Sequence, residues 1–159
     1  MLTATHLHAM IVHFPVALVL VAFFTEVLGL IFKKKFYQQA TFYILILAAL
    51  GTIAAYITGD VAGGGMEGGS LLQAVEAHEE AALLTLLLTI AAAGAKSALY
   101  ILKKEILWLK IVAFVLLLAA AGSVAYTGNL GGQLVFKHAA GVELGFGNSE
   151  TIQNNNVED

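Results

Sequence analysis

The sequence predicts an all-α integral membrane protein built as a four-helix bundle, and both its composition and the spacing of its apolar segments favour that class. Hydrophobic residues make up 59% of the 159-residue chain, only 12% of the residues are charged, and the mean hydropathy is +0.84. A soluble domain needs more polar surface than this composition provides. We expect one transmembrane domain over residues 1–146 and a polar, disordered tail over residues 147–159.

The first half of the chain contains two apolar segments. The first runs from Ile11 to Phe32 and gives a helix of about 33 Å, which is long enough to cross a bilayer core of about 30 Å. A second span is expected from about Phe42 to Ile57. The glycine-rich run 58–65 is predicted to end it.

The second half begins with a predicted helix start outside the membrane. Ser70 and Gln73 have the spacing of a capping box, with Ser70 as the N-cap residue. Helical periodicity then places His78 on the apolar face with Val75 and places Glu80 on the opposite face. His78 is therefore expected to point into the bundle.

Two further spans complete the expected bundle. The third continues to about Ala95, and the fourth runs from about Ile106 to Tyr126. The run 127–132 contains three glycines and is predicted to end the fourth span.

Similar motifs at the ends of the second and fourth spans suggest a duplicated helical hairpin. The first motif consists of Tyr56, Thr58, Gly59, Asp60, Gly63 and Gly64, and it matches Tyr126, Thr127, Gly128, Asn129, Gly131 and Gly132. With this alignment, His13 and His78 would occupy equivalent positions about a pseudo-twofold axis.

The distribution of lysines predicts the orientation in the membrane. Seven of the eight basic residues lie in or beside the first-to-second and third-to-fourth connections, namely Lys33, Lys34, Lys35, Lys96, Lys103, Lys104 and Lys110. By the positive-inside rule these connections are cytoplasmic, so both termini should lie outside. All five histidines and nine of the eleven acidic residues would then be on the outer side.

The histidines are the candidate cofactor ligands. His8, His13, His78 and His138 all fall near the predicted outer face, and helix bundles commonly hold haems and metals between facing helices. The chain has no cysteine, which excludes disulfides, covalent c-type haem attachment and a cysteine-ligated iron–sulfur cluster. A histidine at a membrane interface can also be a simple polar anchor.

Several short motifs resemble a bacterial membrane family called domain of unknown function 2231. The resemblance covers about Leu7 to Val142 and depends on the segment 8–18, the Thr-Gly-Asp break at 58–60, His78, and the segment 131–142. Relatives carry His-Pro at the first motif, whereas this chain has Ala9 after His8. The resemblance implies a protein of the bacterial cytoplasmic membrane. Because relatives are sometimes joined to Rieske-type or cytochrome c-type domains, it also implies redox work at the outer face.

These observations lead us to expect a membrane redox subunit that binds b-type haem non-covalently. His13 and His78 would ligate one haem, and His8 with His138 could hold a second. The remaining predicted contacts to the ring and its propionates come from Lys137 and from the glycine-rich helix ends at Gly59, Gly131 and Gly132. Expected partners are membrane lipid, quinone, an external c-type cytochrome or Rieske protein, and a second copy or a larger redox complex.

Other functions stay open at this point. Three of the histidines with Glu79 or Asp60 could bind a single zinc, copper or iron ion, and a cofactor-free assembly subunit would use the histidines only to line an interface. A transporter is disfavoured because no span places an acid or base near mid-membrane. The sequence has no nucleophile and base pair, no phosphate loop and no nucleic-acid patch, so an electron-transfer subunit is favoured over a stand-alone enzyme.

Overall fold

The computed structural model describes residues 3–64, 69–103 and 106–142. Four long helices account for nearly all of them: α1 (Ala4–Phe32), α2 (Lys35–Gly63), α3 (Gly69–Leu102) and α4 (Leu107–His138). All four are long and apolar enough to cross a membrane. The protein is therefore an all-α, four-helix membrane protein, as predicted. The tail 147–159 lies outside the described residues.

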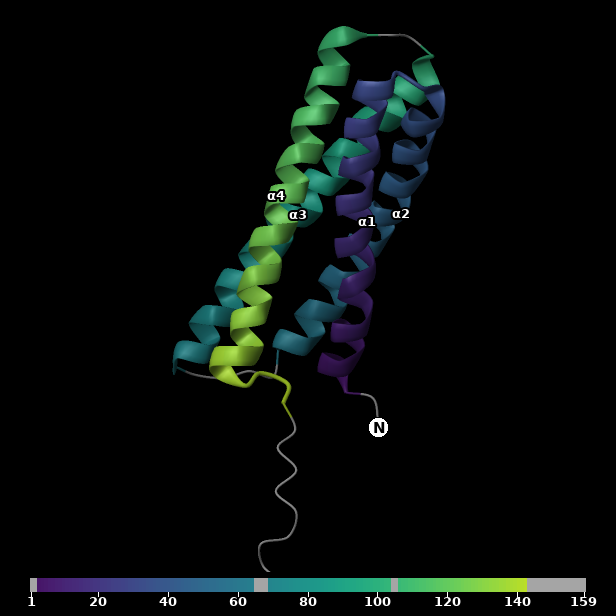
Figure 1. Ribbon diagram of the computed structural model, residues 1–159. Helices are drawn as coiled ribbons and strands as arrows, with labels where there is room; N and C mark the ends of the chain where they lie inside the picture. The colour runs from purple at the N-terminus through teal and green to yellow at the C-terminus, as the bar shows by residue number, and fades with distance from the viewer. Residues whose placement is uncertain (1–2, 65–68, 104–105, 143–159) are drawn as a thin grey trace, which may run out of the picture.

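The helices form an up-and-down bundle of two antiparallel hairpins, α1–α2 and α3–α4 (Figure 1). Each helix packs most extensively on its hairpin partner, while α2 with α3 and α1 with α4 form the contacts between hairpins. The helices α1 and α3 therefore lie diagonally opposite. Both the start of α1 and the end of α4 lie at one end of the bundle, where the two hairpins diverge.

We name the two ends of the bundle by their charged residues. The histidine end carries His8, His78 and His138, and the lysine end carries Lys33, Lys34, Lys35 and Lys103. Which end faces the cytoplasm stays a prediction from the lysine distribution.

The helices extend well beyond the apolar spans. Thr3 caps α1 by accepting a hydrogen bond from the backbone N–H of His6, so α1 starts seven residues before the predicted Ile11. α2 ends at Gly63, within the predicted run 58–65, whereas the predicted end at 127–132 is wrong, because α4 continues to His138. In a low-dielectric environment a helix keeps its backbone hydrogen bonds even through glycines, since no water replaces them.

The boundaries of α3 also differ from the prediction. The helix begins at Gly69, so Ser70 lies in its first turn and is not the N-cap residue. At the other end, α3 continues to Leu102, beyond the predicted end at about Ala95, and contains Lys96, which was predicted to lie in or beside the connection. The predicted orientation of the third helix is confirmed, because Val75 is buried and Glu80 is exposed.

The buried positions repeat between the two hairpins and favour a different register for the suggested duplication. Fully buried positions of α1 recur 70 residues later in α3, and those of α2 recur 72 residues later in α4. The matched pairs are Val19 with Thr89, Ala22 with Ala92, Thr41 with Ala113, Leu45 with Leu117, and Ala48 with Ala120. With this register, the counterpart of Gly59 is Gly131 and not Gly128. The counterpart of His78 is His8 and not His13.

Candidate functional site

The imidazole of His8, on α1, contacts a hydroxyl group of the neighbouring helix α2. Its Nδ1 lies 3.2 Å from Oγ1 of Thr58. The Thr58 hydroxyl lies within hydrogen-bonding distance of the carbonyl oxygens of Ala54 (2.9 Å) and Ala55 (3.1 Å), to which it donates its only proton. Oγ1 of Thr58 must then accept from His8, which places the imidazole proton on Nδ1 and leaves the lone pair on Nε2.

His78 has the same arrangement on α3. Its Nδ1 lies 3.2 Å from the backbone carbonyl oxygen of Thr127 on α4. A carbonyl can only accept, so Nδ1 carries the proton and Nε2 again keeps its lone pair. Among the described residues, neither Nε2 has a hydrogen-bond partner. Metal-ligating histidines usually show this pattern, in which one ring nitrogen is fixed by a hydrogen bond and the other is free to ligate.

Two glycines allow these imidazoles to reach the neighbouring helix. A Cβ atom at Gly59 would lie 3.0 Å from Cε1 of His8, and a Cβ atom at Gly131 would lie 3.2 Å from Cε1 of His78. Gly131 follows the acceptor Thr127 by one helical turn. In the same way, Gly59 follows Ala55, whose backbone carbonyl also interacts with His8. Each imidazole therefore lies against a helix surface from which the side chain is missing.

The equivalence of the two sites follows from this geometry. His8 and His78 lie 70 residues apart on helices α1 and α3, and each contacts a carbonyl and a glycine of its own hairpin. Both side chains are half-buried. The structure thus places one imidazole from each hairpin at the histidine end.

The site of His78 is backed by a network of buried hydroxyl groups. Oγ1 of Thr85 lies 2.7 Å from Oγ of Ser123 and 2.9 Å from Oγ1 of Thr127, the residue whose carbonyl holds His78. The equivalent positions behind His8 are apolar: Pro15 packs against Gly51. The two imidazoles therefore share an acceptor geometry but differ in the polarity of the protein behind them.

His13 lies on a different face of α1. It is exposed, and its Nδ1 hydrogen bonds to the carbonyl oxygen of Ala9 in the same helix at 2.6 Å. Five residues of helix separate it from His8, which turns its side chain by roughly 140°. The structure therefore does not place His13 opposite His78, and the expected pairing of these two residues lacks geometric support.

The other predicted contacts lie at the end of α4. His138 is the half-buried last residue of that helix, and exposed Lys137 donates a hydrogen bond to Oε1 of Gln133 at 2.9 Å. A Cβ atom at Gly132 would meet nothing within 4 Å. These residues share the histidine end with His8 and His78, but Gly132 forms no close contact that requires a glycine.

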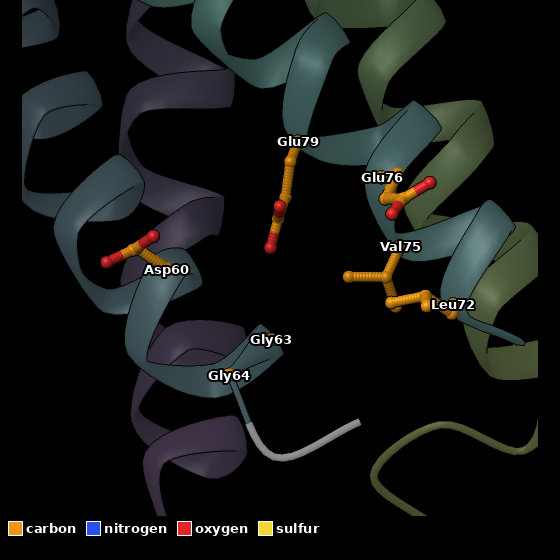
Figure 2. Close-up of a pocket in the computed structure, with 7 residues that line it drawn as sticks. All are labelled: Asp60, Gly63, Gly64, Leu72, Val75, Glu76 and Glu79. Carbon is orange, nitrogen blue, oxygen red and sulfur yellow. The ribbon is translucent and has the colours of Figure 1, made fainter. Parts of the chain in front are cut away.

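The predicted carboxylates line a separate pocket of about 310 Å³ between α2 and α3 (Figure 2). Glu79 extends from α3 toward Gly63 of α2 and contacts it, while Asp60 lies on the opposite wall and is exposed. The pocket lining includes no histidine. Within residues 3–64, 69–103 and 106–142, no three His, Asp or Glu side chains are close enough to hold one metal ion. The expected site of three histidines with Glu79 or Asp60 is therefore not assembled.

The sequence pattern favoured His13 over His8 as a ligand and did not predict the acceptors Thr58 and Thr127. It aligned the two Thr-Gly pairs, 58–59 and 127–128, because their letters match. The alternative register between the two hairpins comes from the buried positions, which only the structure shows and which repeat with a different offset.

The comparisons with known proteins place the chain in a family. The model of the family described as "Predicted membrane protein (DUF2231)" matches residues 4–144. The match covers nearly the whole helical part, so the chain belongs to this family of predicted membrane proteins, and the resemblance noted from the sequence is confirmed. No curated protein and no solved structure matches the chain.

Proposed function

We propose that this protein is a membrane redox subunit that binds b-type haem non-covalently, with His8 and His78 as the axial ligands. The observation that carries the proposal is the pair of equivalent imidazoles at one end of the bundle, each fixed through Nδ1 and each with a free Nε2. Two neutral imidazoles from different helices are a common axial ligand set for haem in helical membrane proteins.

The residues of the histidine end fit such a group. A bis-histidine haem needs two protein ligands, whereas a zinc or copper site needs three or more, and the described residues supply no group of three. The hairpins diverge at this end (Figure 1), and the two imidazoles belong to different hairpins. This arrangement favours haem over a non-haem ion.

Lys137 is the candidate partner for the haem propionates. The chain contains no arginine, and Lys137 is the lysine that the described residues place at the histidine end. Its side chain is exposed, which favours a group whose charged edge faces the membrane surface. When bound, haem would supply a one-electron carrier, and the protein would supply its ligands, orientation and protection from water.

The same proposal names the partners between which electrons pass. Electrons would pass between the quinone pool or a membrane partner and an external carrier such as a c-type cytochrome or a Rieske protein. The support is the position of both imidazoles near one end of the bundle, which the lysine distribution predicts to be the outer end.

The direct test is the colour of the purified protein. Protein from haem-replete cells should contain iron in stoichiometric amount and give the reduced-minus-oxidised spectrum of six-coordinate, low-spin haem b. The haem should be extractable with acidified organic solvent, because no cysteine can attach it. A colourless preparation without iron would reject the proposal and favour a cofactor-free assembly subunit. Stoichiometric zinc or copper would favour a non-haem site.

A further inference from the structure

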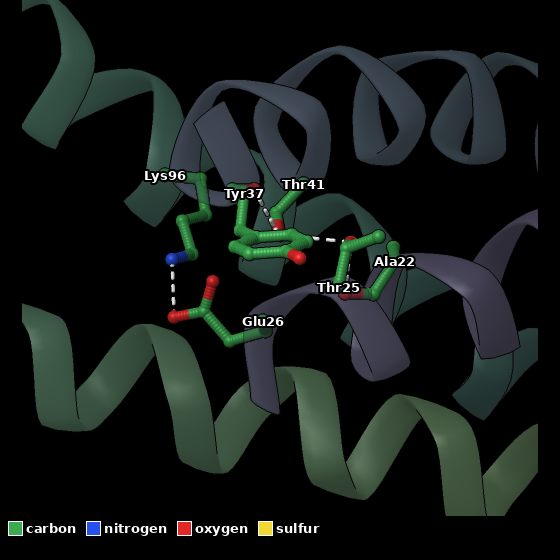
Figure 3. Close-up of polar contacts among 6 residues, drawn as sticks. All are labelled: Ala22, Thr25, Glu26, Tyr37, Thr41 and Lys96. Carbon is green, nitrogen blue, oxygen red and sulfur yellow. Dashed lines mark hydrogen bonds and ion pairs between the residues drawn. The ribbon is translucent and has the colours of Figure 1, made fainter. Parts of the chain in front are cut away.

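A buried ion pair joins the two hairpins near the lysine end. Nζ of Lys96 on α3 lies 2.5 Å from Oε1 of Glu26 on α1, and the two side chains are 10% and 8% exposed (Figure 3). Each residue lies six positions before the end of its helix, about 9 Å along the axis. The pair is therefore inside the bundle and not in the solvated connections.

Burying an ion pair has an unfavourable desolvation free energy. This penalty can exceed the Coulombic attraction between the two charges, and well-packed apolar residues often stabilise as well as a buried ion pair. Oε2 of Glu26 is also buried and has no hydrogen-bond partner among the described residues. A buried ion pair is therefore weak evidence for stability, and specificity of packing is its better-attested role.

The positions of Glu26 and Lys96 indicate that the pair could specify which hairpins pack together. Glu26 and Lys96 are 70 residues apart, the same offset that relates the buried positions of α1 to those of α3. They are therefore equivalent residues that meet across the pseudo-twofold axis. The five matched core pairs named above are uncharged, and this equivalent pair carries opposite charges.

The apolar core discriminates poorly between the hairpins. Leu45 and Ala48 in the first hairpin recur as Leu117 and Ala120 in the second. Two copies of the first hairpin could bury similar surfaces, but they would bring two Glu26 carboxylates together. Two copies of the second hairpin would bring together two Lys96 ammonium groups. Like charges at a buried contact are strongly unfavourable, and the mixed arrangement alone neutralises them.

Glu26 projects from a surface that its own hairpin holds in place. Oγ1 of Thr25 and Oγ1 of Thr41 are 3.0 Å apart, and Thr41 also donates to the carbonyl oxygen of Tyr37 (Figure 3). These bonds link α1 to α2 next to the carboxylate. The charge is therefore part of the docking surface of the first hairpin.

We propose that the Glu26–Lys96 pair selects the partner of each hairpin, so that α1–α2 accepts α3–α4 and rejects another copy of itself. The interaction surface is the lysine-end half of the hairpin interface, and its partner is a hairpin with an ammonium group at the equivalent position. The charges disfavour pairing of like hairpins from two copies of the chain, which would separate His8 from its counterpart His78.

Cross-linking of the full-length chain tests this inference. The natural chain has no cysteine, so F23C with F114C gives one reactive pair, placed where the two phenylalanine rings of α1 and α4 lie 6.2 Å apart. A short bismaleimide should join these positions within one chain in the parent protein. In the neutral variant E26Q/K96M, like hairpins of two chains can pair, which separates positions 23 and 114, so the fraction joined within one chain should fall several-fold while the helical content stays unchanged. The charge swap E26K/K96E should restore the parent pattern.

Each other outcome overturns the inference. If E26Q/K96M keeps the parent yield of cross-links within one chain, the pair does not choose the partner. If E26Q/K96M fails to fold, the pair serves stability. If E26K/K96E gives the pattern of the neutral variant, opposite charge is not what is recognised. None of these results depends on a cofactor.

Discussion

His78 of α3 lies against Gly131 of α4 so closely that a methyl group at position 131 would come within 3.2 Å of Cε1 of the imidazole. The same relationship joins His8 to Gly59 in the other hairpin, at 3.0 Å. Glycines inside membrane helices often serve helix packing alone. Here two of them seat the candidate ligands, and this gives them a role that other glycines of the same helices do not share.

The Gly131→Ala substitution should disturb the ligand more than the helix. The distance from the added methyl group to the His78 ring would be shorter than an ordinary van der Waals contact, so the ring must shift. We therefore expect a reduced haem content and an altered spectrum. Alanine itself favours the helix over glycine by about 1 kcal/mol, so the helix should not unfold. The measurement is haem per protein, together with helical content by circular dichroism.

Gly128→Ala is the matched control for this prediction. A Cβ atom at Gly128 would meet nothing within 4 Å, so this variant should keep the parent haem content and helical content. Equal haem loss in both variants would mean that the contact between His78 and Gly131 does not matter for the cofactor.

The hydroxyl network behind His78 should contribute to stability. Thr85→Val removes the oxygen that links Ser123 to Thr127 and leaves buried hydroxyl groups with fewer partners. We expect a loss of roughly 1 to 2 kcal/mol in the free energy of unfolding. Reversible unfolding in mixed micelles measures it.

Thr52→Val provides the comparison. Thr52 is as buried as Thr85, but among the described residues its hydroxyl bonds only to the carbonyl oxygen of Ala49 in its own helix. This variant should lose less stability than Thr85→Val. A larger loss in Thr52→Val would show that the network does not act as a unit.

Topology is open to a direct labelling test. Cysteines introduced singly at position 34 and in the tail 147–159 can be treated with an impermeant thiol reagent on intact cells, because the parent chain has no cysteine. The lysine distribution predicts labelling of the tail and not of position 34. Labelling at position 34 with a protected tail would reverse the orientation of the bundle.

Hydropathy predicts the number of helices in this chain because each span must bury its backbone hydrogen bonds within one continuous apolar segment. It predicts their ends poorly. α1 starts at Ala4 and α4 continues to His138, since a helix can extend past the apolar core through residues such as Gly131 that hydropathy reads as breaks.

The candidate site was predictable as a cluster of histidines but not as a particular pair. His8 and His13 are both near the start of α1, and only the side of the helix on which each lies separates them. That side is fixed by contacts with Thr58 and Gly59, which are about 50 residues away in the sequence. The partner of Glu26 was missed for a similar reason, because Lys96 falls in a stretch that hydropathy assigns to a connection.

We assign His8 and His78, and not His13, as the ligands of the proposed haem at the histidine end. The most direct measurement is the reduced-minus-oxidised spectrum of three purified variants, H8A, H78A and H13A, each compared with the parent protein at equal protein concentration. We predict that H8A and H78A lose the six-coordinate, low-spin haem spectrum and that H13A retains it. Loss of the spectrum in H13A with retention in H8A would contradict the assignment.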